Sequence, residues 1–182
     1  MRSGHSKLVA ALGVSCLVWM VAATFANAED AVSAAARISR PLAKEQVSSL
    51  FNDKTWHWKD GAAYFSPKSE FWAWAGAGAR SSYAEGTWSA TQTGQLCFTA
   101  RWHTIRGSRR AITCFEHHTD GKAIYQRRLP QGSWYIFGHE PVQSDDEAAK
   151  LTTGNDATSG YEKNKDYVMA RKYQRSKRRA RH

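Results

Sequence analysis

The chain has 182 residues and a formal net charge of +10 at pH 7. The charge is unevenly distributed, because the last twelve residues hold seven lysines and arginines and no acid, whereas residues 29–170 hold 17 basic and 16 acidic groups. A nearly neutral folded part argues against a DNA-binding domain, since such domains spread positive charge over one face of the fold.

The first 28 residues have the pattern of a secretory signal peptide. Arg2 and Lys7 give a positive start, residues 8–25 form an apolar run without a charge, and Ala26-Asn27-Ala28 supplies a small-x-small cleavage site. The pattern predicts cleavage after Ala28 and export to the periplasm or the extracellular space. An uncleaved membrane anchor is the alternative. No later apolar run is long enough to span a bilayer, so we expect no transmembrane segment after cleavage.

Residues 29–53 are predicted to form an Ala- and Ser-rich leader followed by a short helix. Within Pro41–Phe51, Leu42, Val47 and Leu50 recur at helical spacing, and the proline fits the first turn. We expect this helix to plug or flank the domain that follows.

Residues 54–141 are predicted to form a β domain, since apolar and polar residues alternate between frequent turns and most of the tryptophans lie here. The connections are short, so neighbouring strands should be antiparallel. The predicted fold class is therefore mainly β, an antiparallel meander that forms a small barrel or a strongly curved sheet, with short flanking helices. The eight predicted strands are Thr55–Lys59, Ala62–Ser66, Glu70–Ala75, Ser82–Ala90, Gln95–Thr104, Arg110–His118, Ala123–Arg128 and Ser133–Gly138.

Residues 142–170 lose the aromatic content. Gln143–Leu151 has the charge order of a short helix, with three acids ahead of an Ala-Ala-Lys-Leu segment, and a polar loop should follow. Residues 171–182 form a basic tail, predicted to be a solvated helix or disordered.

Several aromatic, glycine and cysteine positions of the β domain agree with a known pattern. They resemble a proteobacterial family of small exported proteins known only as a domain of unknown function, over about residues 50–141. The resemblance implies an exported β-rich domain and no catalytic residues. Gly86-Thr87-Trp88 is also similar to the G-x-W signature of lipocalin- and avidin-like barrels, although here it lies in the middle of the sheet. The matching stretches are TWHWKDGAAYF (55–65), YAEGTW (83–88), LCFTARW (96–102), TCFEHHTDG (113–121), IYQRR (124–128) and SWYIF (133–137).

Cys97 and Cys114 lie on two predicted neighbouring strands and are the cysteines that remain after signal cleavage. If they face each other, Ile105 and Arg106 fall in the hairpin turn, so a cross-strand disulfide is geometrically reasonable. Such a bond contributes about 3 kcal/mol by loop-entropy arguments. A redox-active pair is the alternative, but C-x-x-C spacing is missing.

This register sorts the hairpin residues onto two faces. We expect the apolar set to face the core, because burying it removes more apolar surface from water. The alternative is an interior lined by the polar set. The apolar set is Leu96, Phe98, Ala100, Trp102, Ala111, Thr113, Phe115 and His117; the polar set is Cys97, Thr99, Arg101, His103, Cys114, Glu116 and His118.

No motif for a cofactor or a metal stands out. His117 and His118 are adjacent and would point to opposite faces of a strand, which disfavours a shared ion. A metal site through His57, His103 or His139 has no supporting spacing. We therefore expect no cofactor and no metal.

Trp72 and Trp74 share one face of a predicted strand just before a glycine-rich break. Burial in the core is the first interpretation of such a tryptophan pair. The functional alternative is an aromatic platform that binds a glycan or another small ligand, with Trp72, Trp74 and Arg101 as the candidate ligand-binding residues.

The basic tail predicts attraction to polyanions, with an acidic polysaccharide or an anionic membrane surface favoured over nucleic acid as partner. Solvated disorder without a partner is the alternative. The residues concerned are Arg171, Lys172, Arg175, Lys177, Arg178, Arg179 and Arg181.

Taken as a whole, the sequence predicts an exported, non-catalytic binding or envelope-associated protein. The alternative is a small periplasmic hydrolase or lyase that acts on an envelope polymer, with His103, Glu116 and His118 as acid and base in a polar cavity.

Overall fold

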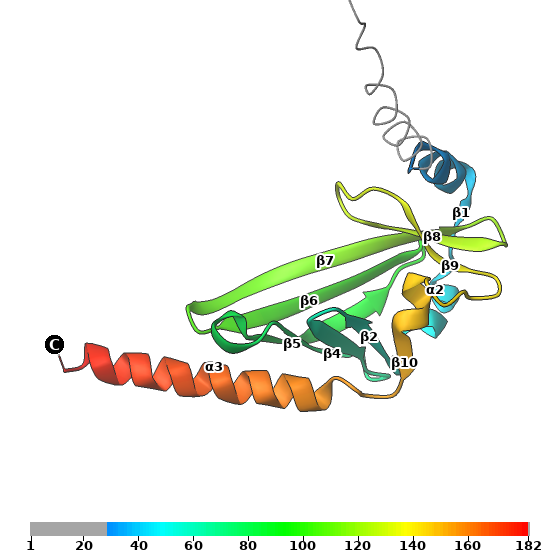
Figure 1. Cartoon of the computed structure of the whole chain (residues 1–182). Helices are drawn as coiled ribbons and strands as arrows, with labels where there is room; N and C mark the ends of the chain where they lie inside the picture. Colours follow the sequence, from blue (N-terminus) through cyan, green and yellow to red (C-terminus); the bar gives the residue numbers. More distant parts are fainter. Residues whose placement is uncertain (1–28, 182) are drawn as a thin grey trace, which may run out of the picture.

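The computed structural model describes residues 29–181, and the predicted signal peptide lies outside them. Within these residues, ten strands form one antiparallel sheet with the order β10-β2-β3-β4-β5-β6-β7-β8-β9, and β1 pairs with β7 beside this path. The sheet curls into a half-barrel (Figure 1). The predicted fold class, a mainly β and strongly curved antiparallel sheet, is confirmed.

The strand bounds follow the predicted ones closely, because turn residues punctuate this part of the chain clearly. Four predicted strands have the observed bounds, and the remaining ones differ by a few residues at their ends. The strands are β1 (Arg40–Pro41), β2 (Lys54–Trp58), β3 (Gly61–Phe65), β4 (Glu70–Ala75), β5 (Ser82–Ala90), β6 (Gln95–Thr104), β7 (Gly107–Thr119), β8 (Ala123–Arg128), β9 (Tyr135–His139) and β10 (Leu151–Thr153). The labelled α-helices are α2 (Lys44–Phe51) and α3 (Thr158–Arg179), and residues 29–38 form a further helix at the N-terminal end of the described residues. Two short 3-10 helices are η1 (Gly78–Arg80) and η2 (Glu147–Lys150).

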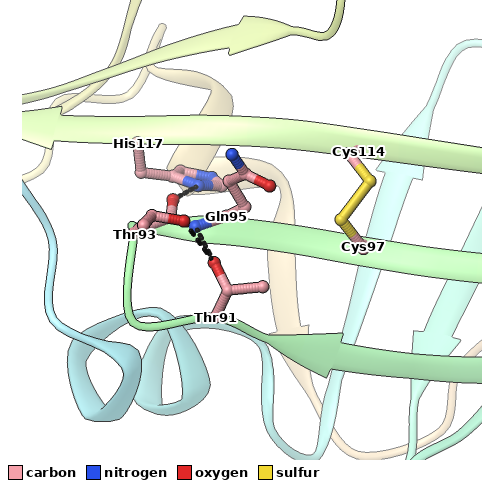
Figure 2. Close-up of a disulfide and its surroundings, with 7 residues drawn as sticks. Thr91, Thr93, Gln95, Cys97, Cys114 and His117 are labelled. Carbon is pink, nitrogen blue, oxygen red and sulfur yellow. Dashed lines mark hydrogen bonds between the residues drawn. A yellow bond between two sulfur atoms is a disulfide. The ribbon is translucent and has the colours of Figure 1, made fainter.

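The long β6–β7 hairpin has the register that the cysteines predict. Cys97 lies opposite Cys114 with their Cα atoms 4.1 Å apart, and a disulfide joins them. Figure 2 shows the bond linking the two neighbouring strands. Thr104 pairs with Gly107, which leaves Ile105 and Arg106 in the turn.

The apolar set of the hairpin faces the concave side of the sheet, as predicted. Leu96 and His117 are fully buried there, and Ala100 is nearly so. The helix α2 covers one end of this concave side with Val47 and Phe51, both of which are fully buried. A helix is therefore present and fills one end of the half-barrel, but it begins at Lys44, and Pro41 lies in β1 and not in the first turn as predicted.

Helix α3 lies on the opposite, convex side and packs against β4, β5 and β6. Val168 and Asn164 are its buried residues. The Asn164 side-chain nitrogen lies 3.1 Å from each of the carbonyl oxygens of Ala75, Gly76 and Ser82, so it satisfies backbone groups at the ends of two strands. The helix continues past residue 170 to Arg179, and the segment assigned to a basic tail forms its last turns (Figure 1).

The segment before α3 differs from its prediction. Within the predicted helix Gln143–Leu151, only Glu147–Lys150 forms a 3-10 helix, and Leu151 then begins the edge strand β10. This strand pairs with β2, about a hundred residues away along the chain, so its short polar sequence carries no local signal of pairing. The turn η2 contacts both β9 and β10 and thus lies between the two ends of the sheet.

Candidate ligand-binding groove

The concave side of the half-barrel is open beyond the region that α2 covers. Aromatic side chains line a groove of about 490 Å³ there, which is within the range of about 300–1,000 Å³ typical of small-molecule sites. The lining is mostly apolar, and three of its side chains are tryptophans. The residues are Trp56, Trp58, Ala63, Phe65, Phe98, Trp102, Ala111, Thr113, Phe115, Arg128, Tyr135 and Glu147.

The strand register explains why the groove is hollow. Trp56 of β2 and Trp102 of β6 lie in one row across the sheet, separated by Ala63, Ala73 and Ala84 of the three strands between them. Because every residue between the two tryptophans is an alanine, small side chains occupy the middle of this row and large indole rings stand at its two ends. A curled sheet with this pattern forms a trough that the side chains of residues 29–181 do not fill.

Some polar groups that line the groove already have hydrogen-bond partners within the protein, and one does not. The Glu147 carboxylate accepts a hydrogen bond from Nε1 of Trp56 at 2.8 Å and forms an ion pair with Lys150 at 2.5 Å. The Tyr135 hydroxyl donates to the side-chain oxygen of Gln126. By contrast, the exposed Arg128 guanidinium forms no hydrogen bond or ion pair within residues 29–181, so it is free to meet an acidic group of a ligand.

A buried histidine, His117, holds the orientation of Gln126, which in turn bonds to the groove residue Tyr135. Nδ1 of His117 lies 3.1 Å from the carbonyl oxygen of Gly94, and Nε2 lies 2.6 Å from the side-chain nitrogen of Gln126. Since a carbonyl oxygen can only accept, Nδ1 carries the hydrogen and Nε2 accepts from Gln126. The side-chain oxygen of Gln126 is then oriented toward Tyr135. Figure 2 shows His117 beside the turn that joins β5 to β6.

This arrangement requires a neutral imidazole. Burial lowers the pKa of His117 to about 4, and the hydrogen bond with Gly94 opposes this shift only in part. Burial, followed by the nearby charge of Glu147, raises the pKa of Tyr135. Both groups are therefore uncharged at neutral pH, as a hydrogen-bond network in an apolar wall needs.

The structure places Trp72 and Trp74 on the convex side, away from the groove. Trp74 lies against α3, where a side chain on Gly160 would overlap its ring, and its buried Nε1 has no hydrogen-bond partner among residues 29–181. Trp72 stacks on Tyr64 and borders a smaller hollow of about 310 Å³ next to the start of α3. The two tryptophans are thus partly covered by a helix, and the open tryptophan cluster is the one on the concave side.

The other residues predicted around a ligand are also on the convex side. Arg101 is exposed and pairs across the sheet with Glu85 and Arg110. His103 stacks on Tyr83 with ring centroids 4.6 Å apart, and its Nδ1 lies 2.9 Å from the Ser108 hydroxyl. None of these side chains reaches the groove, because residues of their parity face away from it.

The three residues predicted as acid and base do not form one site, because Glu116 and His118 are in contact but His103 lies far from both. Nε2 of His118 lies 3.2 Å from the Glu116 carboxylate, which also forms an ion pair with Arg127 at 2.6 Å. His103 pairs with Ser108, eight residues from Glu116 along β7, and this separation amounts to about 26 Å at 3.3 Å per residue. Nδ1 of His118 also lies 2.8 Å from the carbonyl oxygen of Ala36. The Glu116–His118 pair therefore holds the N-terminal helix against the sheet.

The predicted polyanion-binding residues lie on the last turns of α3 or directly after it. Six of them fall between Arg171 and Arg179, and Arg181 follows the helix. Within residues 29–181, no group of histidine, cysteine or acidic side chains is arranged to hold a metal ion.

The groove tryptophans could have been recognised in part from the sequence. Trp56 and Trp58 share a face by parity, as Trp72 and Trp74 do, but parity alone does not say which pair a helix covers. The deciding element is α3, which begins more than eighty residues after Trp74.

Comparison with known proteins identifies one family and no closer relative. The family model described as "Protein of unknown function (DUF995)" matches residues 16–157, which is most of the chain and ends directly before α3. No curated protein and no solved structure matches the chain significantly, so the likeness to lipocalin- and avidin-type barrels finds no support.

Proposed function

Because the chain belongs to the family described as Protein of unknown function (DUF995), we propose its function from its own geometry. It is an exported, non-catalytic binding protein that holds an amphiphile in the concave groove. The amphiphile consists of an apolar chain with one acidic group.

The observation that carries this proposal is the open aromatic trough on the concave side. An apolar, aromatic-lined hollow of this volume with a few polar groups at its border is the usual form of a small-molecule site. Trp56, Trp58 and Trp102 offer apolar contact area, and the unpaired Arg128 offers one positive charge to a carboxylate or phosphate. A glycan is less well suited, because Tyr135 and Glu147 already use their hydrogen-bonding groups within the protein.

Export is part of the proposal and is supported by two features. A disulfide such as Cys97–Cys114 forms and persists in oxidising compartments. The signal pattern of residues 1–28 points to the same compartment. No helix within residues 29–181 combines the length and the apolarity needed to cross a membrane.

A fluorescent fatty acid, cis-parinaric acid, tests the groove. We expect saturable binding to the purified protein, and a loss of about tenfold in affinity for Trp102→Ala, since removing one indole forfeits about 1.4 kcal/mol of contact. The matched control is Trp72→Ala, which removes the same side chain from the convex side and should leave the affinity unchanged. Equal losses for both variants, or no loss for either, would contradict the proposal.

The acidic end of the ligand is tested by a second pair of variants. Arg128→Gln should weaken cis-parinaric acid binding by about fivefold to tenfold, because a charge-assisted hydrogen bond is lost. Arg110→Gln changes the net charge equally from an exposed convex position, and it should have no effect. If the uncharged methyl ester binds the wild type as tightly as the acid does, Arg128 has no role in recognition.

A further inference from the structure

The first part of the basic segment of α3 is docked on the β6–β7 turn, and the last turns of the helix continue past this turn (Figure 1). Nη1 of Arg175 donates a hydrogen bond to the carbonyl oxygen of Ile105 at 2.9 Å. Nζ of Lys172 lies 3.4 Å from the hydroxyl of Ser108. These contacts join segments that are 70 and 64 residues apart in the chain, and Figure 1 shows α3 running alongside the sheet toward this hairpin.

A pocket of about 230 Å³ lies between the turn and the helix. Four cationic side chains border it, Arg106 from the turn and Lys172, Arg175 and Arg179 from the helix, and no acidic side chain does. Residues 172, 175 and 179 recur at helical spacing, so they project from one face of α3 toward Arg106.

The positive charge of this pocket is not neutralised by the described part of the protein. Within residues 29–181, no ion pair involves any of the four cations, whereas Lys165, two turns earlier on the same helix, is paired with Glu85 at 2.8 Å. No acid follows Asp166 in the sequence. Burial lowers the pKa of the neighbouring His103, and the charge of Lys172 adds to this shift while Glu85 opposes it.

Gathering four like charges around one hollow is unfavourable unless an anion joins them. Arginine guanidinium groups match phosphate oxygens in a bidentate manner, and three of the four cations are arginines. We propose that the pocket between the β6–β7 turn and α3 binds a phosphate-type dianion, held by Arg106, Arg175, Arg179 and Lys172. The phosphate can belong to a soluble compound or to a lipid head group.

This site goes beyond the proposed groove and shares none of its residues. It also differs from simple attraction by a basic tail. Arg106, which lies 65 residues before the tail in the sequence, takes part, whereas Lys177 does not border the pocket and lies over the ring of Tyr173 with Nζ 5.2 Å from the ring centre. Lys177 is therefore a matched control on the same helix.

The test is a calorimetric titration of the full protein with inorganic pyrophosphate at low salt. Binding should be saturable, and Arg106→Gln should weaken it about tenfold, as should Arg179→Gln. Lys177→Gln, which removes the same charge, should change the affinity less than twofold. Neither Arg106 nor Lys177 is buried, so both variants are expected to fold. If the wild type does not bind, or if Arg106→Gln and Lys177→Gln weaken binding equally, the pocket proposal is overturned.

Vesicles distinguish the two sources of phosphate. Retention on phosphatidylcholine vesicles that contain phosphatidic acid, abolished by Arg106→Gln and competed by pyrophosphate, assigns the site to a lipid head group. Pyrophosphate binding without such retention assigns it to a soluble phosphorylated compound. Cis-parinaric acid binding should be unchanged in Arg106→Gln, so a failure of this site and a failure of the groove are measured separately.

Discussion

Gly86→Ala is expected to lower the free energy of unfolding by about 3 kcal/mol, at the upper end of the usual cost of overpacking. Gly86 lies in the middle of β5, opposite Ala100 of β6. A Cβ atom added there would overlap the carbonyl oxygen of Thr99 and would lie 2.7 Å from the Cα atom of Ala100. These are backbone atoms of the neighbouring strand, so no side chain can rotate away and the two strands must separate.

Urea unfolding followed by circular dichroism measures this loss. Gly107→Ala is the matched control, because within residues 29–181 no heavy atom outside Gly107 and its two chain neighbours lies within 4 Å of the position of the added Cβ. This control should stay within about 0.5 kcal/mol of the wild type. Equal stability of Gly86→Ala and Gly107→Ala would mean that β5 and β6 do not approach each other as closely as described.

Acid is expected to destabilise the protein through His117 between pH 6.5 and pH 4. The pKa of this histidine is lowered from 6.5 to about 4 in the folded protein, so the unfolded chain takes up a proton first as the pH falls. The stability that the neutral, buried imidazole contributes is therefore fully present above about pH 6.5 and is lost as the pH falls toward 4. The loss amounts to about 3 kcal/mol when the shift is converted at about 1.4 kcal/mol per pH unit.

A His117→Gln variant isolates this contribution from other acid-sensitive groups. The amide can donate to Gly94 and accept from Gln126 but does not titrate, so the variant should unfold more easily at neutral pH and show a flatter slope between pH 6.5 and pH 4. Hydrogen bonds lower the pKa of Asp120, and this carboxylate contributes in both proteins at lower pH. Urea unfolding at a series of pH values gives the two slopes. Parallel slopes would show that His117 is not the group whose protonation is linked to unfolding.

The register of the β6–β7 hairpin, and with it the face on which each side chain lies, could be predicted from the sequence. Placing Cys97 opposite Cys114 fixes one register, and that register correctly assigned Leu96, Ala100 and His117 to the buried side. The assignment succeeds because side chains alternate strictly along paired strands, so one known pair determines all the others. The same argument placed Arg101 on the outer side.

The position of the groove could not be obtained in this way. Parity groups Trp56 with Trp58 and Trp72 with Trp74, but both pairs have the same composition and either could face solvent. The outcome depends on long-range packing, since α2 fills only one end of the concave side and α3 lies on the convex side. Neither helix position follows from local propensity.

The network behind the groove wall is another feature of tertiary structure. The sequence places His117 on the inner side of β7, but the pattern does not show that Gln126 of β8 bonds to it, or that Tyr135 of β9 bonds in turn to Gln126. Likewise, Arg106 joins the basic face of α3 only because the helix returns to the hairpin turn. This pairing joins segments more than sixty residues apart, so it carries no local signal.

The most direct test of the central claim is to locate a bound ligand. A fatty acid that carries a diazirine on its chain can be cross-linked to the protein by light, and the labelled residues identified by mass spectrometry of peptides. A ligand in the concave groove predicts labels on Trp56, Trp102 and Phe115, with none on Trp72. Labels confined to Trp72 and the convex side, or spread without preference over both sides, would contradict it.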